Sequence, residues 1–153
     1  LTNHHEFMNA GGVLDRKRID EHGNRIIEDY NIDGRTDSPI GTLSGGNIQK
    51  VILARELEQA EDFVMFSEPT WGLDIASSEF IYRKILETRA NSTAVLLLTS
   101  NIDEIFTLAD NVIVLYRGKM VANRLVDSEL SPEILGEYML GLKDDFIEGK
   151  NEA

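Results

Sequence analysis

The stretch Leu43–Lys50 reads LSGGNIQK. Ser44 and two glycines stand directly ahead of an apolar-periodic run, which predicts a helix N-cap followed by a glycine-rich first turn. The first backbone amides of a helix have no partner inside it, and they lie at the positive end of its dipole, so such a start can bind an anion. The local pattern alone leaves two interpretations open, a capped helix after a loop and a loop that contacts phosphate.

Composition limits the class of protein. The chain has 153 residues, 42% of them hydrophobic, which suits one domain or two small lobes with a buried core. With 27 acidic against 15 basic residues, the formal charge of -12 argues against a nucleic-acid backbone or an anionic lipid surface as a direct partner. Cysteine is absent, which excludes disulfides and thiolate metal sites. Because the first residue is Leu1 and not Met, we expect a piece of a longer polypeptide.

The part of the chain before residue 61 predicts a helical lobe. Residues 15–31 place apolar side chains at helical spacing, and a second helix is expected over residues 47–59, directly after the opening stretch. His4 and His5 have no third metal ligand nearby, so we interpret them as part of a solvated helix face. Nothing here alternates like a strand, and residues 1–60 are therefore predicted to form a helical subdomain.

From residue 61 onward the pattern changes to strands that alternate with helices. Short apolar runs predict buried strands at residues 63–66, 94–99 and 111–116. Helices are predicted at residues 75–89, at residues 101–109 and from Ser131 onward. Leu86 is expected to face inward in the first of these, and Ile52 is expected to face a core in the helix over residues 47–59. A tight turn at Arg117 and Gly118 leads from the third strand into an antiparallel partner. The alternation predicts an α/β fold with a mostly parallel sheet and flanking helices over residues 61–142, followed by a flexible tail over residues 143–153.

Polar side chains follow the carboxyl ends of the first two predicted strands, where α/β proteins place functional residues. Ser67 and Glu68 end the first strand, Ser100 ends the second, and Asp74 lies in the turn beyond Glu68. A glutamate in such a place can polarise a water for attack on a phosphate. The residues alone leave this open and favour an acid that caps the next helix or pairs with a lysine.

These motifs, in this order, resemble the ATPase subunits of ABC transporters. Leu43–Lys50 looks like their signature motif, Phe63–Asp74 like the Walker B strand with its glutamate and D-loop, Leu96–Glu104 like the switch region, and Val112–Val121 like the strand pair that closes the catalytic core. Asn47 stands where most members have glutamine. In this the chain resembles the importers of simple sugars and nucleosides, in particular the second ATPase half of their tandem subunits. The resemblance implies a P-loop NTPase-like fold of the ABC ATPase type, present here as a fragment.

Several positions depart from the family pattern. A phosphate loop of the form G-x-x-x-x-G-K-[ST] does not occur, and we expect the phosphate-loop strand to be missing because the chain starts too late to contain it. The resemblance places Ser67 at the Walker B aspartate, Ser100 at the switch histidine and Glu68 at the catalytic base. A serine hydroxyl supplies neither the charge of a carboxylate to magnesium nor the donor of an imidazole. The chain's own site is therefore expected to be degenerate, without a metal site, and Glu68 to contribute little.

In this family each nucleotide lies between two ATPase halves. The resemblance implies that Ser44, Gly45, Gly46 and Asn47 contact ATP held by the partner half, with Asp74 in the adjoining D-loop. It implies ATP and Mg²⁺ in the intact assembly, a second ATPase domain and a transmembrane permease as partners, no nucleic acid, and a cytoplasmic place on the inner face of the cell membrane. We expect the intact subunit to couple ATP hydrolysis to uptake of a sugar or nucleoside. The fragment alone is expected to be inactive and to hold no cofactor tightly.

Other interpretations stay open. A non-catalytic ABC-like module for dimerisation or regulation is favoured by Ser67 and Ser100 and disfavoured by the intact signature stretch. An ABC ATPase of DNA repair or translation usually carries coiled-coil insertions or basic surfaces, which this sequence lacks, and a flavodoxin-like binding domain does not explain the ordered motifs. The family places the phosphate-loop strand between residues 94–99 and 111–116. We therefore expect these two strands to pair directly, or the fragment to dimerise or swap.

Overall fold

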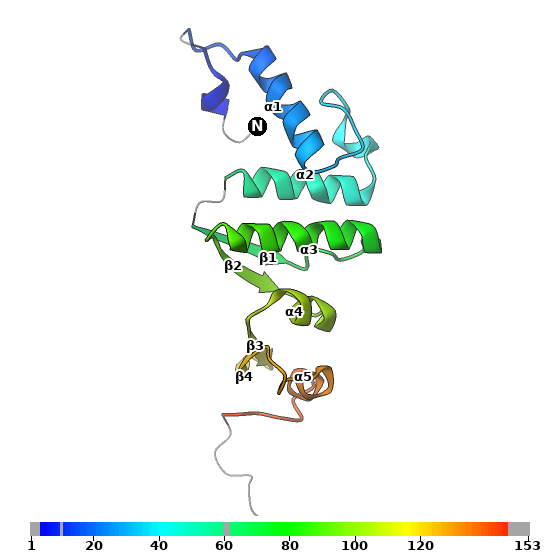
Figure 1. Cartoon of the computed structure of the whole chain (residues 1–153), viewed down its shortest axis with the longest axis vertical. Helices are drawn as coiled ribbons and strands as arrows, with labels where there is room; N and C mark the ends of the chain where they lie inside the picture. The colour runs from blue at the N-terminus through cyan, green and yellow to red at the C-terminus, as the bar shows by residue number, and fades with distance from the viewer. Residues whose placement is uncertain (1–3, 10, 60–61, 147–153) are drawn as a thin grey trace, which may run out of the picture. The chain divides into compact units, whose positions relative to one another are not determined.

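The computed structural model describes residues 4–9, 11–59 and 62–146. Helices and strands alternate along the chain in the predicted order (Figure 1): α1 Arg16–Asp29, α2 Gly45–Leu57, β1 Phe63–Ser67, α3 Ile75–Ala90, β2 Ala94–Leu98, α4 Ile102–Leu108, β3 Asn111–Tyr116, β4 Lys119–Leu125 and α5 Pro132–Met139. Two short 3-10 helices, η1 His4–Phe7 and η2 Ile40–Thr42, were not predicted. The α/β prediction is confirmed, with two small sheets in the described part of the chain. None of the described helices is long and apolar enough to cross a membrane.

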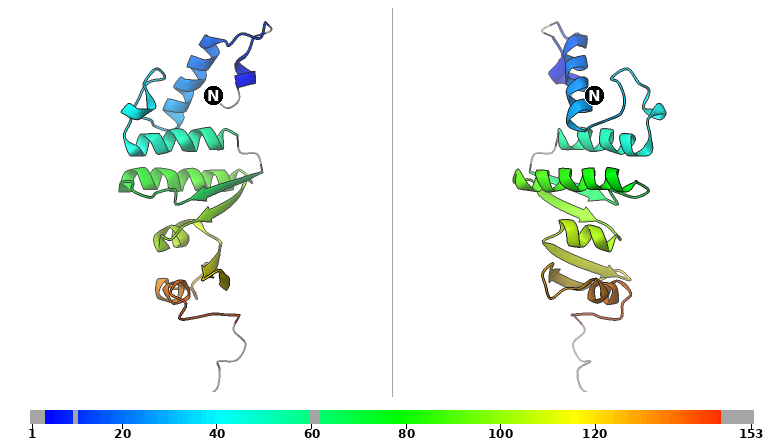
Figure 2. Two further views of the ribbon diagram at one scale, coloured as in Figure 1. Left: turned by 180° about the vertical axis from the view of Figure 1, so that it is seen from behind. Right: turned by 45° about the vertical axis from the view of Figure 1, so that its right-hand side comes forward.

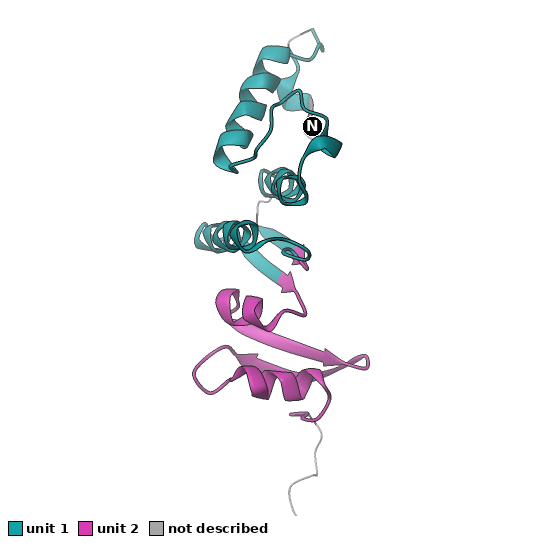
Figure 3. Ribbon diagram, turned by 90° about the vertical axis from the view of Figure 1, so that its right-hand side faces the viewer, with its two compact units in different colours: residues 1–65, 69–96 teal, residues 66–68, 97–153 magenta. Residues whose placement is uncertain are grey.

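The chain divides into two compact units, which Figure 3 colours separately. Unit 1 comprises residues 1–65 and 69–96, and unit 2 comprises residues 66–68 and 97–153. The division crosses β1 and β2, which are hydrogen-bonded to each other. The Ala94 amide donates to the Asp62 carbonyl near the start of both strands, and the Glu68 amide donates to the Leu98 carbonyl near their ends. The pair therefore runs in parallel, as predicted.

In unit 1, α2 and α3 lie side by side (Figures 1 and 2). Apolar side chains of both helices are buried, namely Leu53, Ala54, Phe80, Ile81 and Ile85. The end of α1 joins them through Tyr30, whose ring centroid lies 6.4 Å from that of Phe80. Burial is the main cause that raises the pKa of Tyr30 above its ordinary value. Lys50 of α2 places its Nζ 4.9 Å from the Phe80 ring centroid, a favourable cation–π distance.

In unit 2, β3 and β4 form an antiparallel hairpin beside α5 (Figure 2). Arg117 and Gly118 have φ values of 48° and 77°, as the two-residue turns that suit strand twist require. The hairpin and the helices around it share one apolar core, formed by Ile105, Val112, Val114, Val121, Ala122, Leu130, Leu135 and Tyr138. The predicted hairpin is therefore confirmed, and it is closed by local chain geometry and packed by α5.

A polar cluster around the buried Tyr138 holds the segment after α5. The Asp145 carboxylate accepts Arg124 Nε at 2.7 Å, Arg124 Nη2 at 2.9 Å and the Tyr138 hydroxyl at 2.6 Å. The bonds from Arg124 are the main cause that lowers the pKa of Asp145. The Asp145 amide also donates to the Val121 carbonyl at 2.9 Å. The structure thus fixes the first residues of the segment 143–153 that the sequence predicts to be flexible, while residues 147–153 of that prediction lie outside the described residues.

Some predictions of burial are wrong. Val64 and Phe66 of β1 are buried, but the alternate residues Phe63 and Met65 are 57% and 56% exposed. The strand was expected to be covered on both faces, and among the described residues only one face is covered. The helical residues Ile52 and Leu86, expected to face a core, are also exposed, because α2 and α3 bury other faces against each other.

The predicted direct pairing of β2 with β3 does not form. In the described part of the chain, β1 pairs with β2 and β3 pairs with β4, as two separate two-stranded sheets. The physical reason is that β3 obtains a neighbour through a two-residue turn, which closes at little entropic cost, whereas β2 is separated from it by α4. The alternative, a swapped or dimeric arrangement that covers the open edges, stays a prediction.

Candidate functional site

The signature stretch forms the start of α2. Ser44 is the N-cap residue, with extended backbone dihedrals of φ -65° and ψ 158°. Its Oγ accepts the Asn47 backbone amide at 3.3 Å and the Asn47 side-chain Nδ2 at 3.1 Å. Ser44 and Gly45 are exposed, whereas Gly46 and Asn47 are half-buried. The interpretation as a capped helix is therefore confirmed, and the cap residue itself faces outward.

The donors at this helix start match the chemistry of an anion. In the described part of the chain, the amides of Gly45 and Gly46 donate to no acceptor. Both lone-pair positions of Ser44 Oγ are occupied by Asn47, so its hydroxyl hydrogen is left to donate elsewhere. The first turn of α2 carries no acidic residue. Three hydrogen-bond donors at the positive end of a helix, without a competing carboxylate in that turn, fit a phosphate group.

Asp74, predicted to belong to a D-loop, lies next to this turn in unit 1. Asp74 is the N-cap of α3, and its Oδ1 and Oδ2 accept the Ser77 amide at 2.9 Å and the Ser77 hydroxyl at 2.8 Å. These bonds, the backbone one first, lower the pKa of Asp74. A β-carbon built on Gly46 would lie 2.7 Å from Ser77 Oγ. Gln49 Nε2 donates to the Pro69 carbonyl at 3.2 Å. The structure therefore brings the predicted signature and D-loop residues together.

A second group of predicted residues belongs to unit 2. Glu68 has a left-handed backbone with φ 45°, unusual for a residue before proline, and a conformation that stores strain. Its Oε1 accepts the Ser100 amide at 2.9 Å, and its Oε2 accepts the Thr99 hydroxyl at 3.4 Å. Thr99 Oγ1 in turn accepts the Asn101 amide at 3.0 Å. Glu68 thus ties the end of β1 to the start of the switch region through its own carboxylate.

The chemistry of this second group does not fit a metal centre. Ser67 contributes an exposed hydroxyl at the end of β1, and Ser100 contributes its backbone amide to Glu68. Across the described ranges, no three His, Cys, Asp or Glu side chains are grouped so that they could hold a metal ion. Magnesium prefers carboxylate and water oxygens in octahedral geometry, and the carboxylate of this group, that of Glu68, already accepts two hydrogen bonds from the protein.

Sequence reasoning missed the residues that connect the predicted ones. Thr99 directly precedes Ser100 at a strand end, so its position alone was a usable signal. Ser77 lies three residues after Asp74, the spacing at which a helix cap meets its amide partner, which was also readable. Gln49 and its contact to Pro69, twenty residues away in sequence, had no local signal.

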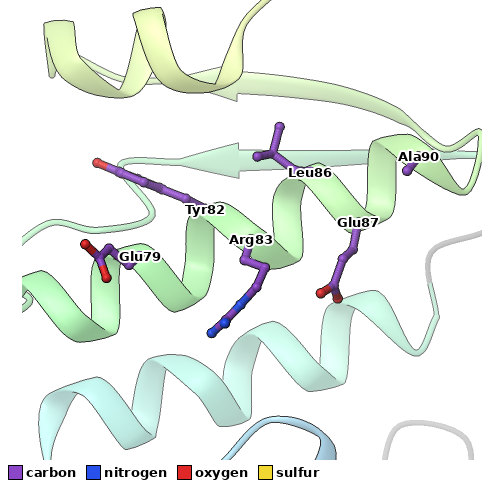
Figure 4. A pocket seen from close by; sticks show the side chains of 6 residues that line it. All are labelled: Glu79, Tyr82, Arg83, Leu86, Glu87 and Ala90. Atoms are coloured by element: carbon purple, nitrogen blue, oxygen red, sulfur yellow. The ribbon is translucent and has the colours of Figure 1, made fainter.

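Surface depressions do not coincide with the predicted site. The larger one, about 490 Å³, lies along α3 and is lined by Glu79, Tyr82, Arg83, Leu86, Glu87 and Ala90 (Figure 4). Another, in unit 1, is lined by residues of α1 and of the segment 34–37. Neither includes Ser44, Asp74 or Glu68. Of the predicted residues, Ser44, Gly45 and Asp74 are exposed, and Gly46, Asn47 and Glu68 are half-buried.

Comparisons with known proteins agree with the motifs. The glucose import ATP-binding protein of Haloferax volcanii is 36% identical over 137 residues, which cover 88% of this chain and 24% of that protein. The guanosine import ATP-binding protein of Bacillus subtilis is 34% identical over 136 residues, 87% of this chain and 25% of that protein. The ribose import ATP-binding protein of Hahella chejuensis is 32% identical over 146 residues, 95% of this chain and 29% of that protein. The chain thus spans about a quarter of the length of the curated relatives it matches.

Solved structures agree on the fold. A metal-chelate type ABC transporter in an inward-facing conformation matches with a TM-score of 0.71 at 16% identity, over 93% of this chain and 56% of that chain. An ATP-binding cassette solved as a dimer in a post-hydrolysis state with ADP and Pi matches with a TM-score of 0.65 at 19% identity, over 76% of this chain and 51% of that chain. No protein-family model matches the sequence. The chain is therefore related, in sequence and in fold, to the ATP-binding proteins of ABC transporters, specifically to those that import sugars and nucleosides.

Proposed function

We propose that this chain is part of the ATP-binding subunit of an ABC importer for a sugar or nucleoside, and that it completes the nucleotide site of a partner ATPase half. Ser44, Gly45 and Gly46 supply the donors that face this nucleotide, Asn47 belongs to the same helix turn, and Asp74 holds the adjoining D-loop. The observation that carries the proposal is the start of α2, where the Ser44 hydroxyl hydrogen and the amides of two glycines point to no acceptor in the described residues.

The chain's own nucleotide site is proposed to be degenerate. The Walker B and switch positions hold Ser67 and Ser100, which provide no carboxylate and no imidazole. Glu68 is the remaining acid, and its two oxygens accept hydrogen bonds from Ser100 and Thr99. A general base has to reach a water with an available lone pair, and a carboxylate that holds two chain segments together is poorly suited to that task. Glu68 therefore serves the structure of the switch region.

Glu68→Gln is expected to leave ATP turnover of the intact transporter within about twofold of the unchanged protein, because a general base would be worth about 100-fold or more. The glutamine carbonyl accepts the Ser100 amide as the carboxylate does, and its NH₂ group can donate to Thr99 Oγ1. The measurement is phosphate release by the purified transporter under saturating ATP. A loss in the range of a general base would assign catalysis to Glu68 and contradict the degenerate site.

The isolated chain is expected to show no magnesium-dependent ATP hydrolysis, because it lacks a phosphate loop and because its exposed donors face a nucleotide that the partner holds. The measurement is phosphate release by the purified chain, with the intact subunit as positive control under the same conditions. Turnover that follows the concentration of the chain, and that survives a further purification step, would contradict the proposal.

The partners follow from the same proposal. We propose a second ATPase half across the nucleotide, and a transmembrane permease that contacts the helical subdomain at residues 1–60 and keeps the assembly on the inner face of the membrane. ATP and Mg²⁺ bind in the intact assembly. Residues 61–142 form the C-terminal part of the ATPase core. A non-catalytic module for dimerisation or regulation is the second candidate, and Ser67 and Ser100 favour it. A transporter whose turnover is indifferent to Ser44 would favour that module.

A further inference from the structure

We propose that Asn47 is a positioning residue for Ser44. Its side-chain amide holds the Ser44 hydroxyl and the turn after α1 in one hydrogen-bonded arrangement, and it affects the nucleotide site through Ser44 and not by a contact of its own. The proposal rests on the proposed function, in which Ser44 faces the nucleotide of the partner half.

The two ends of the Asn47 amide have different partners. Nδ2 donates to Ser44 Oγ at 3.1 Å, and Oδ1 accepts the backbone amide of Asp33 at 3.0 Å. Exchanging the oxygen and nitrogen of this amide would turn an NH₂ group toward the Asp33 N–H, where two donors would face each other. The bond to Asp33 therefore fixes the orientation in which Nδ2 meets Ser44. The half-buried Asn47 amide thus links Ser44 at the start of α2 to Asp33 in the turn after α1.

This arrangement decides the direction of the Ser44 hydroxyl hydrogen. The Asn47 backbone amide and Nδ2 both donate to Ser44 Oγ, so both acceptor positions of the oxygen are filled from the protein side. The hydrogen then points away from Asn47. An N-cap serine without the second bond can rotate its hydroxyl toward several acceptors, whereas this one is set as an outward donor. Preorganised donors of this kind stabilise charge without reorganising as it forms.

A second side chain on the same face of α2 also forms a hydrogen bond with the turn after α1. Lys50, one turn beyond Asn47, donates from Nζ to the Asn31 carbonyl at 2.8 Å. Asn31 has a left-handed backbone with φ 46°, and it lies two residues beyond the end of α1 and two residues before Asp33. Residues three apart on a helix lie on the same face, so Asn47 and Lys50 both form hydrogen bonds with the backbone of residues 31–33. Within unit 1, the direction of the Ser44 hydroxyl is thus coupled to the end of α1.

Asn47→Asp in the intact transporter tests the inference, because it keeps the size of the side chain and reverses its role. A carboxylate still accepts the Asp33 amide with one oxygen, and the other accepts the Ser44 hydroxyl, which turns the hydrogen inward. We expect kcat for ATP to fall about tenfold while KM changes by less than about twofold, as for a group that acts mainly in the transition state. The matched control is Asn123→Asp, the same change of charge at an exposed position of β4, where a carboxylate oxygen still accepts Asn111 Nδ2, and it should leave both constants unchanged.

A double-mutant cycle separates positioning from contact. Asn47→Ala loses both side-chain bonds without adding a charge, and with Ser44 in place it should reduce kcat as Asn47→Asp does. On a Ser44→Ala background, Asn47→Ala is expected to reduce kcat by less than about twofold further, because the group it acts through is gone. If Asn47→Ala removes the same factor with and without the Ser44 hydroxyl, Asn47 contributes on its own and the inference is wrong. If Ser44→Ala alone leaves turnover unchanged, the proposed function fails, and with it the reason for a positioning residue.

Discussion

Ser44→Arg is expected to reduce ATP turnover of the intact transporter about 100-fold or more, the loss that follows removal of a preorganised donor from a charged transition state. Three physical effects act together. The substitution removes the hydroxyl that caps α2, worth about 1 kcal/mol of helix stability. It puts a cation beside the positive end of the helix dipole. It also fills the exposed space in front of Gly45 and Gly46, where the partner's nucleotide is proposed to lie.

The matched control for this prediction is Ser44→Thr. Threonine keeps both the hydroxyl and the capping ability, so turnover is expected to stay within about threefold of the unchanged protein. The measurement is steady-state phosphate release, with thermal unfolding of each purified variant as a check on folding. Turnover that survives arginine, or that falls equally with threonine, would contradict a specific role of the hydroxyl at this position.

Gly46→Ala is expected to reduce turnover about tenfold, because overpacking a close contact costs about 1–3 kcal/mol. The new β-carbon would lie 2.7 Å from Ser77 Oγ and 3.4 Å from Ser77 Cβ. Ser77 cannot move aside without breaking its hydroxyl bond to Asp74 Oδ2, which is 2.8 Å long. The methyl group therefore either displaces the first turn of α2 or disrupts the cap of α3. Both disturb the pair of loops that the proposed function assigns to the partner's nucleotide.

Ser77→Gly provides the test of that cause. With glycine at residue 77, the atoms that a methyl on Gly46 would meet first are gone, and the next neighbour, Asp74 Oδ2, lies at 3.9 Å. The double variant Gly46→Ala/Ser77→Gly should therefore recover most of the turnover that Gly46→Ala loses, although Ser77→Gly alone weakens the cap. If the double variant stays as impaired as Gly46→Ala, the glycine serves the approach of the nucleotide and not the packing against α3.

The local signals in the sequence were enough to place the helices and strands. Ser44 and Ser131 cap α2 and α5 as predicted, and the turn at Arg117 and Gly118 closes the predicted hairpin. Asp74, predicted only to lie in a turn, caps α3. Caps and two-residue turns involve atoms within three or four residues of each other, so periodicity and turn chemistry are sufficient to find them. Burial was harder to predict, because Ile52 and Leu86 fit a helical stripe whose partner face only tertiary packing decides.

The residues of the candidate site were largely predictable, and their connections were not. Ser44 was predicted as a helix cap and Asp74 as a turn residue beyond the first strand, and the family resemblance implies their roles. The contact between Gly46 and Ser77, the bond from Gln49 to Pro69 and the bridge from Asn47 to Asp33 join segments far apart in the chain. The pairing of β2 with β3 was mispredicted for the same reason, since strand pairing depends on contacts between distant segments that no local pattern encodes.

The central claim is that Ser44 faces a phosphate and does not only cap a helix, and Ser44→Asp separates the two roles most directly. Aspartate is as good an N-cap as serine, so the helix and the thermal unfolding midpoint should be preserved. Its negative charge, however, would stand beside the phosphate that the loop is proposed to contact, in place of a donor. The account predicts that ATP turnover of the intact transporter falls about 100-fold with Ser44→Asp while the protein stays folded. Turnover close to that of the unchanged protein would show that the residue only caps α2, and would contradict the account.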